Sequence, residues 1–457
     1  MRRGWCVRVR VGRWVGRWAW WSCGDRPVHV GQFSRVGGTP RPWSRRASQL
    51  LPPDGTRRRE VGLSECMKYE TLADRRPGTH EYTRFHARCL CAMQAPLVGD
   101  AVKRSRREGN AGVTPGGALV VSLDFELAWG MLDVADVEGA WREVAVRTRE
   151  AIPRMLDRFA ARGVEATWGT VGLLFAHSRE EALTFLPEVR PRYAPPLVDP
   201  YALLQRGAMR DEVSWFAPSL VEAIVATPGQ ELASHSFWHF TALEDGFDRA
   251  SFEADVAAAV AIAAARGVPL RSWIWPRHQV RPEWLPILAG AGFDVHRGPA
   301  RHRWYAPAKG RQGGWATRAA RLADAYVALT GNGSFGAAEL DATAPLLDVP
   351  ESRFLRPAPL PGRPWWTVWE PLRVERIVAA MRHAARNDEV LHVWWHPHNF
   401  GGNVPASFAA LDTILEAFEV LRDTHGMASW SMAGLADAVR AWAGRVSSSE
   451  GSPNTSA

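Results

Sequence analysis

The stretch "GALVVSLDFELAWG", residues 117–130, decides the fold class of this 457-residue chain. It is an apolar run of strand-forming residues that ends in two acidic residues. The segment "EGAWREVAVRTREAIPRMLDRFAARG" (138–163) follows with helical spacing and stops at a glycine, and "VEATWGTVGLLF" (164–175) again has the character of a strand. A strand, a helix and a strand in this order predict a parallel β-sheet.

The same alternation continues through the rest of the chain. Further strand candidates are "QELASHSFWHF" (230–240), "LRSWIWPRHQV" (270–280), "GFDVHRG" (292–298) and "EVLHVWWHPHN" (389–399), and helical patterns separate them. The last part predicts two helices around a short strand at "MASW" (427–430). Repeated βα units favour an α/β fold whose strands close into a barrel, over residues 116–445.

Residues 1–115 have a different composition from the remainder. They contain 23 Lys and Arg against 9 Asp and Glu, a net charge of +14, whereas the rest of the chain carries −6. The formal charge of +8 and the pI near 9.6 therefore arise in this segment, so they do not predict a nucleic-acid partner for the larger part. All 5 cysteines also lie here, at spacings that match no zinc pattern, and the larger part can hold neither disulfides nor a thiolate metal site.

The basic start of the chain does not read as a targeting signal, because Arg8, Arg10, Arg13 and Arg17 interrupt every apolar run. We expect residues 1–115 to be a disordered or non-native extension, with Met67 or Met93 as alternative starts. A basic arm that binds nucleic acid or a membrane is the other interpretation. No apolar run approaches the ~20 residues of a membrane span. Since no secretion signal is readable at the written start or directly after Met67 or Met93, we expect a cytoplasmic protein. Residues 446–457 are expected to form a disordered tail.

Polar residues gather where the predicted strands end. Asp124 and Glu126 are two apart in a strand, which places both carboxylates on one face. His235 and His239 are four apart, which suits two imidazoles on one side of a helical turn that bind a divalent metal. Further polar residues follow later strands: Arg277, and then His396 with His398.

Each of these residues has an ordinary structural explanation when it is considered alone, such as a capping carboxylate or a histidine hydrogen-bonded in a turn. Together they favour a catalytic site, because the carboxyl ends of parallel strands in a barrel meet at one face.

Four motifs in this order, "SLDFELAWG", "SHSFWH", "WPRHQ" and "WWHPHNFGG", resemble those of the polysaccharide deacetylases with NodB homology, a carbohydrate esterase-type family. The resemblance is to a bacterial branch with an S-L-D-F-E first motif, and it covers roughly residues 116 to 445. It implies a distorted (β/α)7 barrel and metal-dependent hydrolysis of an N-acetyl group on a carbohydrate, with Zn²⁺ as the expected cofactor.

The resemblance also implies a role for each residue. Asp124 would be the general base, Glu126 would bind the metal together with His235 and His239, and either His396 or His398 would be the general acid. Better-known members have two adjacent aspartates in place of Asp-Phe-Glu, and an R-x-P motif in place of Trp-Pro-Arg. Arg277 is therefore assigned only to orienting Asp124.

Two other classes of function stay open. A protein of the same fold can hydrolyse an O-acetyl ester or a small cyclic amide, and a non-catalytic relative can bind a glycan. The presence of Asp124, His235, His239 and His396 disfavours the non-catalytic relative. A panel of acetylated sugars, with acetate release as the readout, separates the hydrolases.

Removal of residues 1–92 is expected to leave the chain folded and active, since the barrel pattern begins near Gly116 and the deleted segment lacks the periodicity of a packed element. Thermal melting and acetate release of the truncated protein measure this. A melting temperature lower by ~10 °C, or several kcal/mol of lost stability, would show that the segment packs on the barrel.

Overall fold

The computed structural model describes residues 116–450 except 138, 196, 208–212, 311–313 and 363–368, together with two short strands near the N-terminus. These strands, β1 (Trp21–Cys23) and β2 (Arg26–Val28), pair antiparallel with each other and belong to a separate unit. The rest of the expected extension over 1–115 lies outside the described residues, as does the end of the tail from 451 onward.

The main unit alternates strands and helices as predicted. Its longer strands are β3 (Ala118–Phe125), β4 (Ala166–Thr170), β5 (Gln230–Ser234), β6 (Ser272–Ile274), β7 (Val295–Gly298), β9 (Leu347–Pro350), β11 (Glu389–Trp395) and β12 (Ala428–Trp430), with two-residue strands β8 (Phe335–Gly336) and β10 (Arg353–Phe354). Its α-helices are α2 (Ala140–Arg162), α3 (Arg179–Thr184), α4 (Pro200–Arg206), α5 (Pro218–Ala226), α6 (Arg249–Ala264), α7 (Leu285–Gly290), α8 (Trp315–Asp324), α10 (Glu370–Asn387), α11 (His398–Gly401), α12 (Val404–His425) and α13 (Met432–Glu450).

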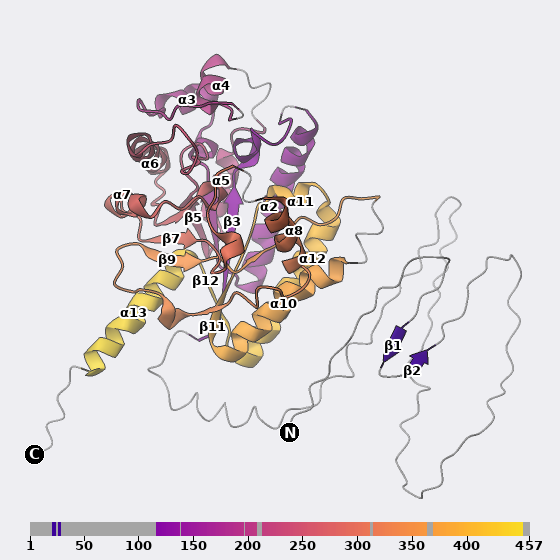
Figure 1. Ribbon diagram of the computed structural model, residues 1–457. Coiled ribbons are helices and arrows are strands. Elements are labelled where there is room, and N and C mark those ends of the chain that lie inside the picture. The colour runs from indigo at the N-terminus through magenta and orange to yellow at the C-terminus, as the bar shows by residue number, and fades with distance from the viewer. Residues whose placement is uncertain are drawn as a thin grey trace, which may run out of the picture. The chain divides into compact units, whose positions relative to one another are not determined.

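Parallel pairing runs through the strands in the order β10, β11, β3, β4, β5, β6, β7 and β9. The two ends of this path, β9 and β10, are consecutive in the chain and separated only by Glu351 and Ser352. The segment from Leu347 to Phe354 therefore pairs with β7 through its first half and with β11 through its second half. It closes a barrel of seven strand positions, which confirms the predicted α/β fold (Figure 1).

Alternation along β3 decides which residues face the barrel interior. All eight of its residues are buried. Ala118 and Val120 belong to a small apolar cluster with residues of β7, β9 and α13, whereas Leu119, Val121, Leu123 and Phe125 belong to the large core that includes the residues of α2. Because the side-chain period of a strand is two, the interior row continues as Ser122, Asp124 and Glu126 toward the carboxyl end. The interior is therefore apolar at one end and polar at the other.

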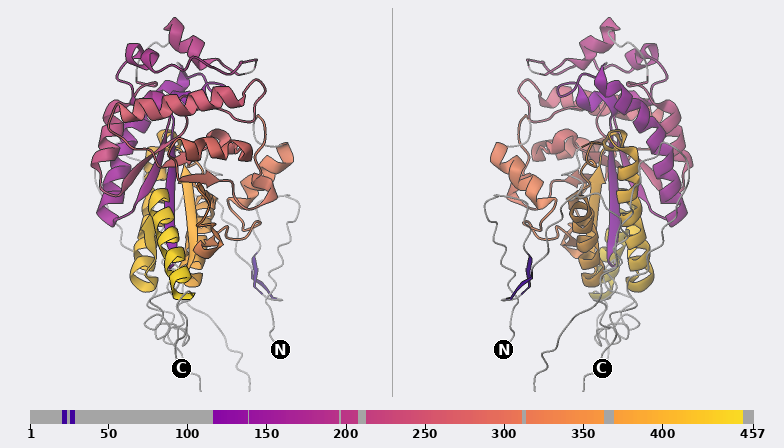
Figure 2. Two further views of the ribbon diagram at one scale, coloured as in Figure 1. Left: turned by 90° about the vertical axis from the view of Figure 1, so that its left-hand side faces the viewer. Right: turned by 90° about the vertical axis from the view of Figure 1, so that its right-hand side faces the viewer.

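The apolar end of the barrel is filled by the last strand and helix. β12 pairs with Ala118–Val120 of β3, and β4 pairs only with Ser122–Phe125, so the two share one side of β3. Met432, Leu435, Ala436 and Val439 of α13 are buried against the interior cluster. Figure 2 shows α13 along the strands, at the end of the barrel away from α3 and α4. α13 continues to Glu450, so the helix extends into the segment from 446 that was expected to be a disordered tail.

The short helix α11 packs closely on α2 (Figure 1). A Cβ atom on Gly401 would lie 2.5 Å from the Val144 carbonyl oxygen and 3.0 Å from Thr148 Oγ1. Arg147 Nε also donates to the Gly401 carbonyl oxygen at 2.5 Å. These contacts fix the loop that carries the histidines of "HPH".

Among the described helices, none combines the length and the apolar composition that a membrane span requires.

Gly401→Ala is expected to destabilise the protein by ~1 to 3 kcal/mol. The added methyl group would clash with the backbone of α2, which cannot move aside as a flexible side chain can. Gly290→Ala is the matched control, because Gly290 ends α7 with open space where its Cβ would lie. Urea unfolding of both variants measures the difference. Equal stability of the two variants would show that α2 and α11 separate without cost.

Candidate active site

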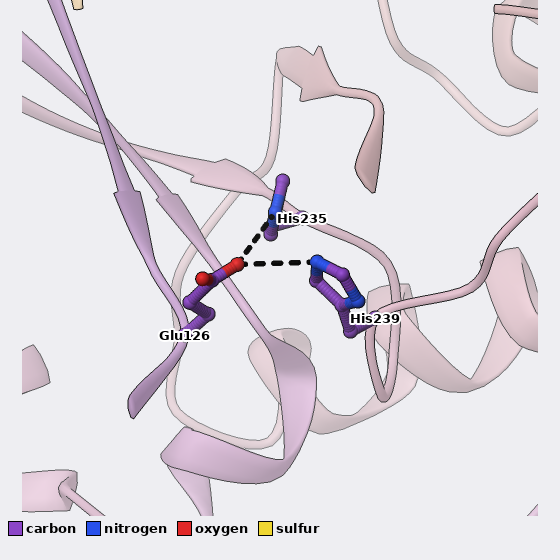
Figure 3. Close-up of side chains that lie close together, drawn as sticks. All are labelled: Glu126, His235 and His239. Carbon is purple, nitrogen blue, oxygen red and sulfur yellow. Dashed lines mark ion pairs between the residues drawn. The ribbon is translucent and has the colours of Figure 1, made fainter. Parts of the chain in front are cut away.

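Three predicted ligands meet at the carboxyl end of the barrel. Glu126 follows β3, and His235 follows β5 directly, with His239 four residues later. Glu126 Oε2 lies 3.4 Å from His235 Nε2 and 3.1 Å from His239 Nε2. Figure 3 marks both ion pairs with dashed lines. One possible ligand atom from each of the three residues lies within 4.8 Å of the others, and all three side chains are buried. The structure thus brings together the three residues that were predicted as ligands, in a group that could hold a metal ion.

The two histidines do not lie on a helical turn, which corrects the local prediction. Residues 235–240 form a loop in which Ser236 and His239 have positive φ angles of 63° and 88°. Ser236 Oγ accepts hydrogen bonds from the backbone N–H groups of His239 (2.9 Å) and Phe240 (2.6 Å). Backbone in this region is strained for residues other than glycine, and such strain is common at functional sites. The loop therefore brings the imidazoles together by a specific turn that helical spacing does not describe.

The triad fits a divalent cation. His235 Nδ1 lies 2.9 Å from the Ile274 carbonyl oxygen and so donates to it. In the neutral imidazole, Nε2 is then the acceptor nitrogen, and it faces the carboxylate. Neither His235 Nε2 nor Glu126 Oε2 has a hydrogen-bond partner in the described part of the chain. Two buried acceptors that face each other are costly unless a cation lies between them. Two imidazoles and one carboxylate are the donor set of many catalytic zinc sites.

Gly130, the last residue of the first motif, makes room for Glu126. A Cβ atom on Gly130 would lie 2.1 Å from Glu126 Cδ and 2.3 Å from each carboxylate oxygen. Burial alone would raise the pKa of Glu126, but the surrounding histidines His396 and His239 hold it well below its usual value. The carboxylate is therefore both positioned and ionised.

Asp124 is held by an arginine that sequence reasoning did not identify. Arg297, in β7, donates to both carboxylate oxygens of Asp124, from Nη1 at 2.7 Å and from Nη2 at 2.8 Å. Burial would raise the pKa of Asp124, but the Arg297 guanidinium outweighs it and holds the pKa well below the usual range. The signal was present in "GFDVHRG", where a charged residue falls within a short strand next to a glycine.

Arg277, which was assigned to orient Asp124, lies elsewhere. Its Nη2 donates to Asp133 Oδ2 at 2.5 Å. Arg277 and His278 both have positive φ angles, of 54° and 52°, so the chain turns sharply directly after Pro276. Arg297 takes the position against Asp124 that was expected for Arg277, although Arg277 still lines the same cavity.

A buried hydrogen-bond chain supports Arg297. Arg297 Nη1 also donates to Ser122 Oγ at 3.0 Å, so the Ser122 hydroxyl is free to donate to His392 Nε2 at 2.8 Å. His392 Nδ1 then donates to the Pro350 carbonyl oxygen at 3.2 Å. Burial lowers the pKa of His392 to about 3, so this imidazole is neutral, as the chain of donors requires. The network links β3, β7, β11 and the closing segment around one carboxylate.

The two histidines of "HPH" approach Oε1 of Glu126, whereas His235 and His239 approach Oε2. His396 Nε2 is 3.7 Å from Asp124 Oδ2 and 3.7 Å from Glu126 Oε1, and its side chain is 23% exposed. His398 Nδ1 is 3.7 Å from Glu126 Oε1, and its ring packs edge-on against Trp141. The two imidazoles stack with centroids 4.8 Å apart. His396 is thus the more accessible of the two.

A cavity of about 520 Å³ opens onto this site. Asp124, Glu126 and all four histidines line it, as do His278, Glu351 and Trp394. The Trp394 ring lies beneath the Arg297 guanidinium at 4.7 Å and stacks on Phe354. All the predicted site residues therefore border one cavity.

Glu351 is an ionisable residue of the cavity wall that the sequence did not identify. Its Oε2 lies 3.4 Å from His278 Nδ1, and burial raises the pKa of Glu351 to about 7 despite the nearby Arg297. The other charged groups that act on it are Asp124, which raises this pKa, and Arg321, which lowers it. The folded state therefore retains a proton that the unfolded chain loses near pH 4.5.

The stability that this retained proton contributes is fully present below about pH 4.5 and is lost as the pH rises through about 7. Glu351→Gln is expected to stabilise the protein relative to wild type by up to roughly 3 kcal/mol at pH 9, with little difference at pH 4.5. Denaturant unfolding of both proteins across this range measures the difference. A difference that does not change with pH would show that Glu351 is ionised throughout.

The structure is similar to several solved structures at low sequence identity. A protein from Mycobacterium smegmatis described as a polysaccharide deacetylase is 14% identical with a TM-score of 0.43, over 72% of this chain and 95% of its own. Puue allantoinase is 14% identical with a TM-score of 0.42, over 73% of this chain and 96% of its own. A protein from Pseudomonas aeruginosa PAO1 described as a polysaccharide deacetylase is 16% identical with a TM-score of 0.40, over 71% and 90%. No protein-family model and no curated protein matches the chain. Likeness of this degree assigns no activity, so the function rests on the site itself.

Proposed function

We propose that this chain is a metal-dependent hydrolase that removes N-acetyl groups from a carbohydrate. The observation that supports this most is the arrangement of two carboxylates with separate partners in one cavity. Glu126 faces His235 and His239, whereas Asp124 is held by Arg297. One carboxylate is thus available to a cation and the other to a proton.

Glu126, His235 and His239 would hold the cation, for which Zn²⁺ is the best candidate. A divalent cation there would polarise the acyl carbonyl and lower the pKa of water from 15.7 to about 7, which allows a base as weak as Asp124 to take a proton.

Asp124 would act as the general base. Arg297 keeps it ionised and fixes the plane of its carboxylate through two parallel hydrogen bonds. Arg297 donates one hydrogen bond to each oxygen, so each oxygen keeps a further lone pair, and Asp124 lines the cavity from which water would approach. General base catalysis by a positioned group contributes ~10²- to 10⁴-fold.

His396 would act as the general acid. An amide nitrogen leaves poorly unless it receives a proton, whereas the oxygen of an ester leaves more readily, so a proton donor opposite the base favours N-acetyl over O-acetyl substrates. His396 Nε2 lies 3.7 Å from an oxygen of each carboxylate and reaches the cavity. His398 packs behind it and supports its ring.

The two carboxylates should respond differently to substitution. Glu126→Gln and His239→Ala are each expected to lower bound zinc, because each removes a ligand atom from the triad. Asp124→Asn should keep its zinc and lose ~10²-fold or more in turnover, since the amide cannot accept the proton. Elemental analysis and acetate release on the same preparations measure both effects.

Glu143→Gln and His177→Ala are the matched controls, because both residues are exposed and lie outside the cavity. The substrates are N-acetylated and O-acetylated oligosaccharides and a small cyclic amide. Zinc loss in Asp124→Asn with retention in Glu126→Gln would reverse the two roles. Turnover of only the ester or only the cyclic amide would reject the N-acetyl substrate.

A further inference from the structure

The wall of the cavity beyond the triad is basic. Six arginines line it: Arg277, Arg321, Arg353, Arg356, Arg373 and Arg376. Three of them have carboxylate partners, in the pairs Arg277 with Asp133, Arg353 with Asp324 and Arg373 with Glu370. These pairs neutralise part of the wall, and Arg321 donates to the Trp304 carbonyl oxygen. Arg376 and Arg356 remain.

Arg376 is a buried cation that forms no ion pair with any of the described residues. Its residue is 6% exposed, it lies in α10, and one of its nitrogens, Nη2, donates to the Gly331 carbonyl oxygen. Its Nε and Nη1 have no hydrogen-bond partner among the described residues. Burial lowers the pKa of Arg376 to about 10, which still leaves it protonated at neutral pH.

Asp324 acts electrostatically on Arg376, but its carboxylate is already engaged. It accepts hydrogen bonds from Arg353, Tyr305 and Thr330. A buried charge without a partner destabilises a fold by several kcal/mol, so its presence on a cavity wall indicates a ligand that completes it.

Arg356 is a second cation of this kind. It follows β10, is half-buried, and its guanidinium lies 5.9 Å from the centre of the Phe354 ring. No carboxylate in the described segments lies within ion-pair distance of it. Arg356 and Arg376 therefore both line the cavity that also contains the triad.

We propose that Arg376 and Arg356 bind an anionic group of the ligand, a carboxylate or a phosphate, so that the molecule processed in this cavity is an acidic carbohydrate. Planar guanidinium groups recognise both kinds of anion through pairs of parallel hydrogen bonds. The substrate class rests on the proposed function, whereas the anion site itself does not. A neutral oligosaccharide would leave the two cations without a counter-ion.

Binding to metal-free protein tests the anion site without any need for turnover. D-Glucuronate, inorganic phosphate and the neutral control D-glucose are titrated by calorimetry into protein treated with a chelator, at constant ionic strength. Wild type should bind at least one of the two anions and not glucose. Arg376→Gln and Arg356→Gln should each weaken that binding by ~10-fold or more, and the tighter anion identifies the group.

Arg382→Gln is the matched control, because Arg382 lies in the same helix, is 45% exposed at its side chain and pairs with Glu375 outside the cavity. It should bind as wild type does. Equal binding by all variants, loss in the control as great as in Arg376→Gln, or absence of binding in wild type would each overturn the site. If Arg376→Gln melts at a much lower temperature than wild type, Arg356→Gln decides the outcome. Arg356 is only half-buried, so its replacement disturbs the fold less.

Kinetics with the zinc-loaded enzyme then test the substrate class. N-Acetylglucosamine 6-phosphate and N-acetylmuramic acid are compared with neutral N-acetylglucosamine. Wild type should prefer an acidic sugar by ~10-fold or more in kcat/KM, and Arg376→Gln should raise KM for that sugar alone. Equal kcat/KM for acidic and neutral sugars would overturn the substrate class. Anion binding without turnover of any sugar would reject the proposed function and leave the anion site in place.

Discussion

The buried contact between Arg297 and Asp124 is the interaction on which the site depends. Either residue without the other would strongly destabilise the folded protein, since removal of one partner of a buried ion pair costs ~3 to 5 kcal/mol of stability. Together they require β3 and β7 to lie on opposite sides of one interior, and the hydrogen bonds through Ser122 and His392 extend this requirement to β11. The position of Asp124 is thus fixed by barrel closure rather than by a flexible loop.

Much of this arrangement was predictable because strands have a period of two. The motif around Asp124 and Glu126 shows in the sequence that both carboxylates share a face, and the structure places that face inside the barrel. The ends of the longer strands were also predictable, and they bring His235 and His396 to the same cavity. These predictions needed only the local alternation and the rule that parallel strands end together.

What could not be predicted depends on pairing between distant strands and on unusual backbone angles. The local sequence marks Arg297 only as a charged residue within a short strand. Its contact with Asp124 depends on the position of β7 across the barrel, which no local pattern reports. Arg277 turns to Asp133 through positive φ angles that the sequence does not reveal. The closing segment from Leu347 to Phe354 was missed because it consists of two short strands interrupted at Glu351, which weakens any strand signal.

The pairing of β3 has a consequence for how the chain acquires its fold. β3 begins at Ala118, yet its partners at that end are β11 and β12, which begin at Glu389 and Ala428. During synthesis the apolar first half of β3 therefore stays unpaired at its edges until some 270 to 310 later residues have been made. Contacts between such distant segments slow folding, because the loop must close before the pairing stabilises it. An unpaired apolar strand is also prone to intermolecular pairing. The first strand of the barrel, β3, therefore needs protection from aggregation until β12 has been made and pairs with it.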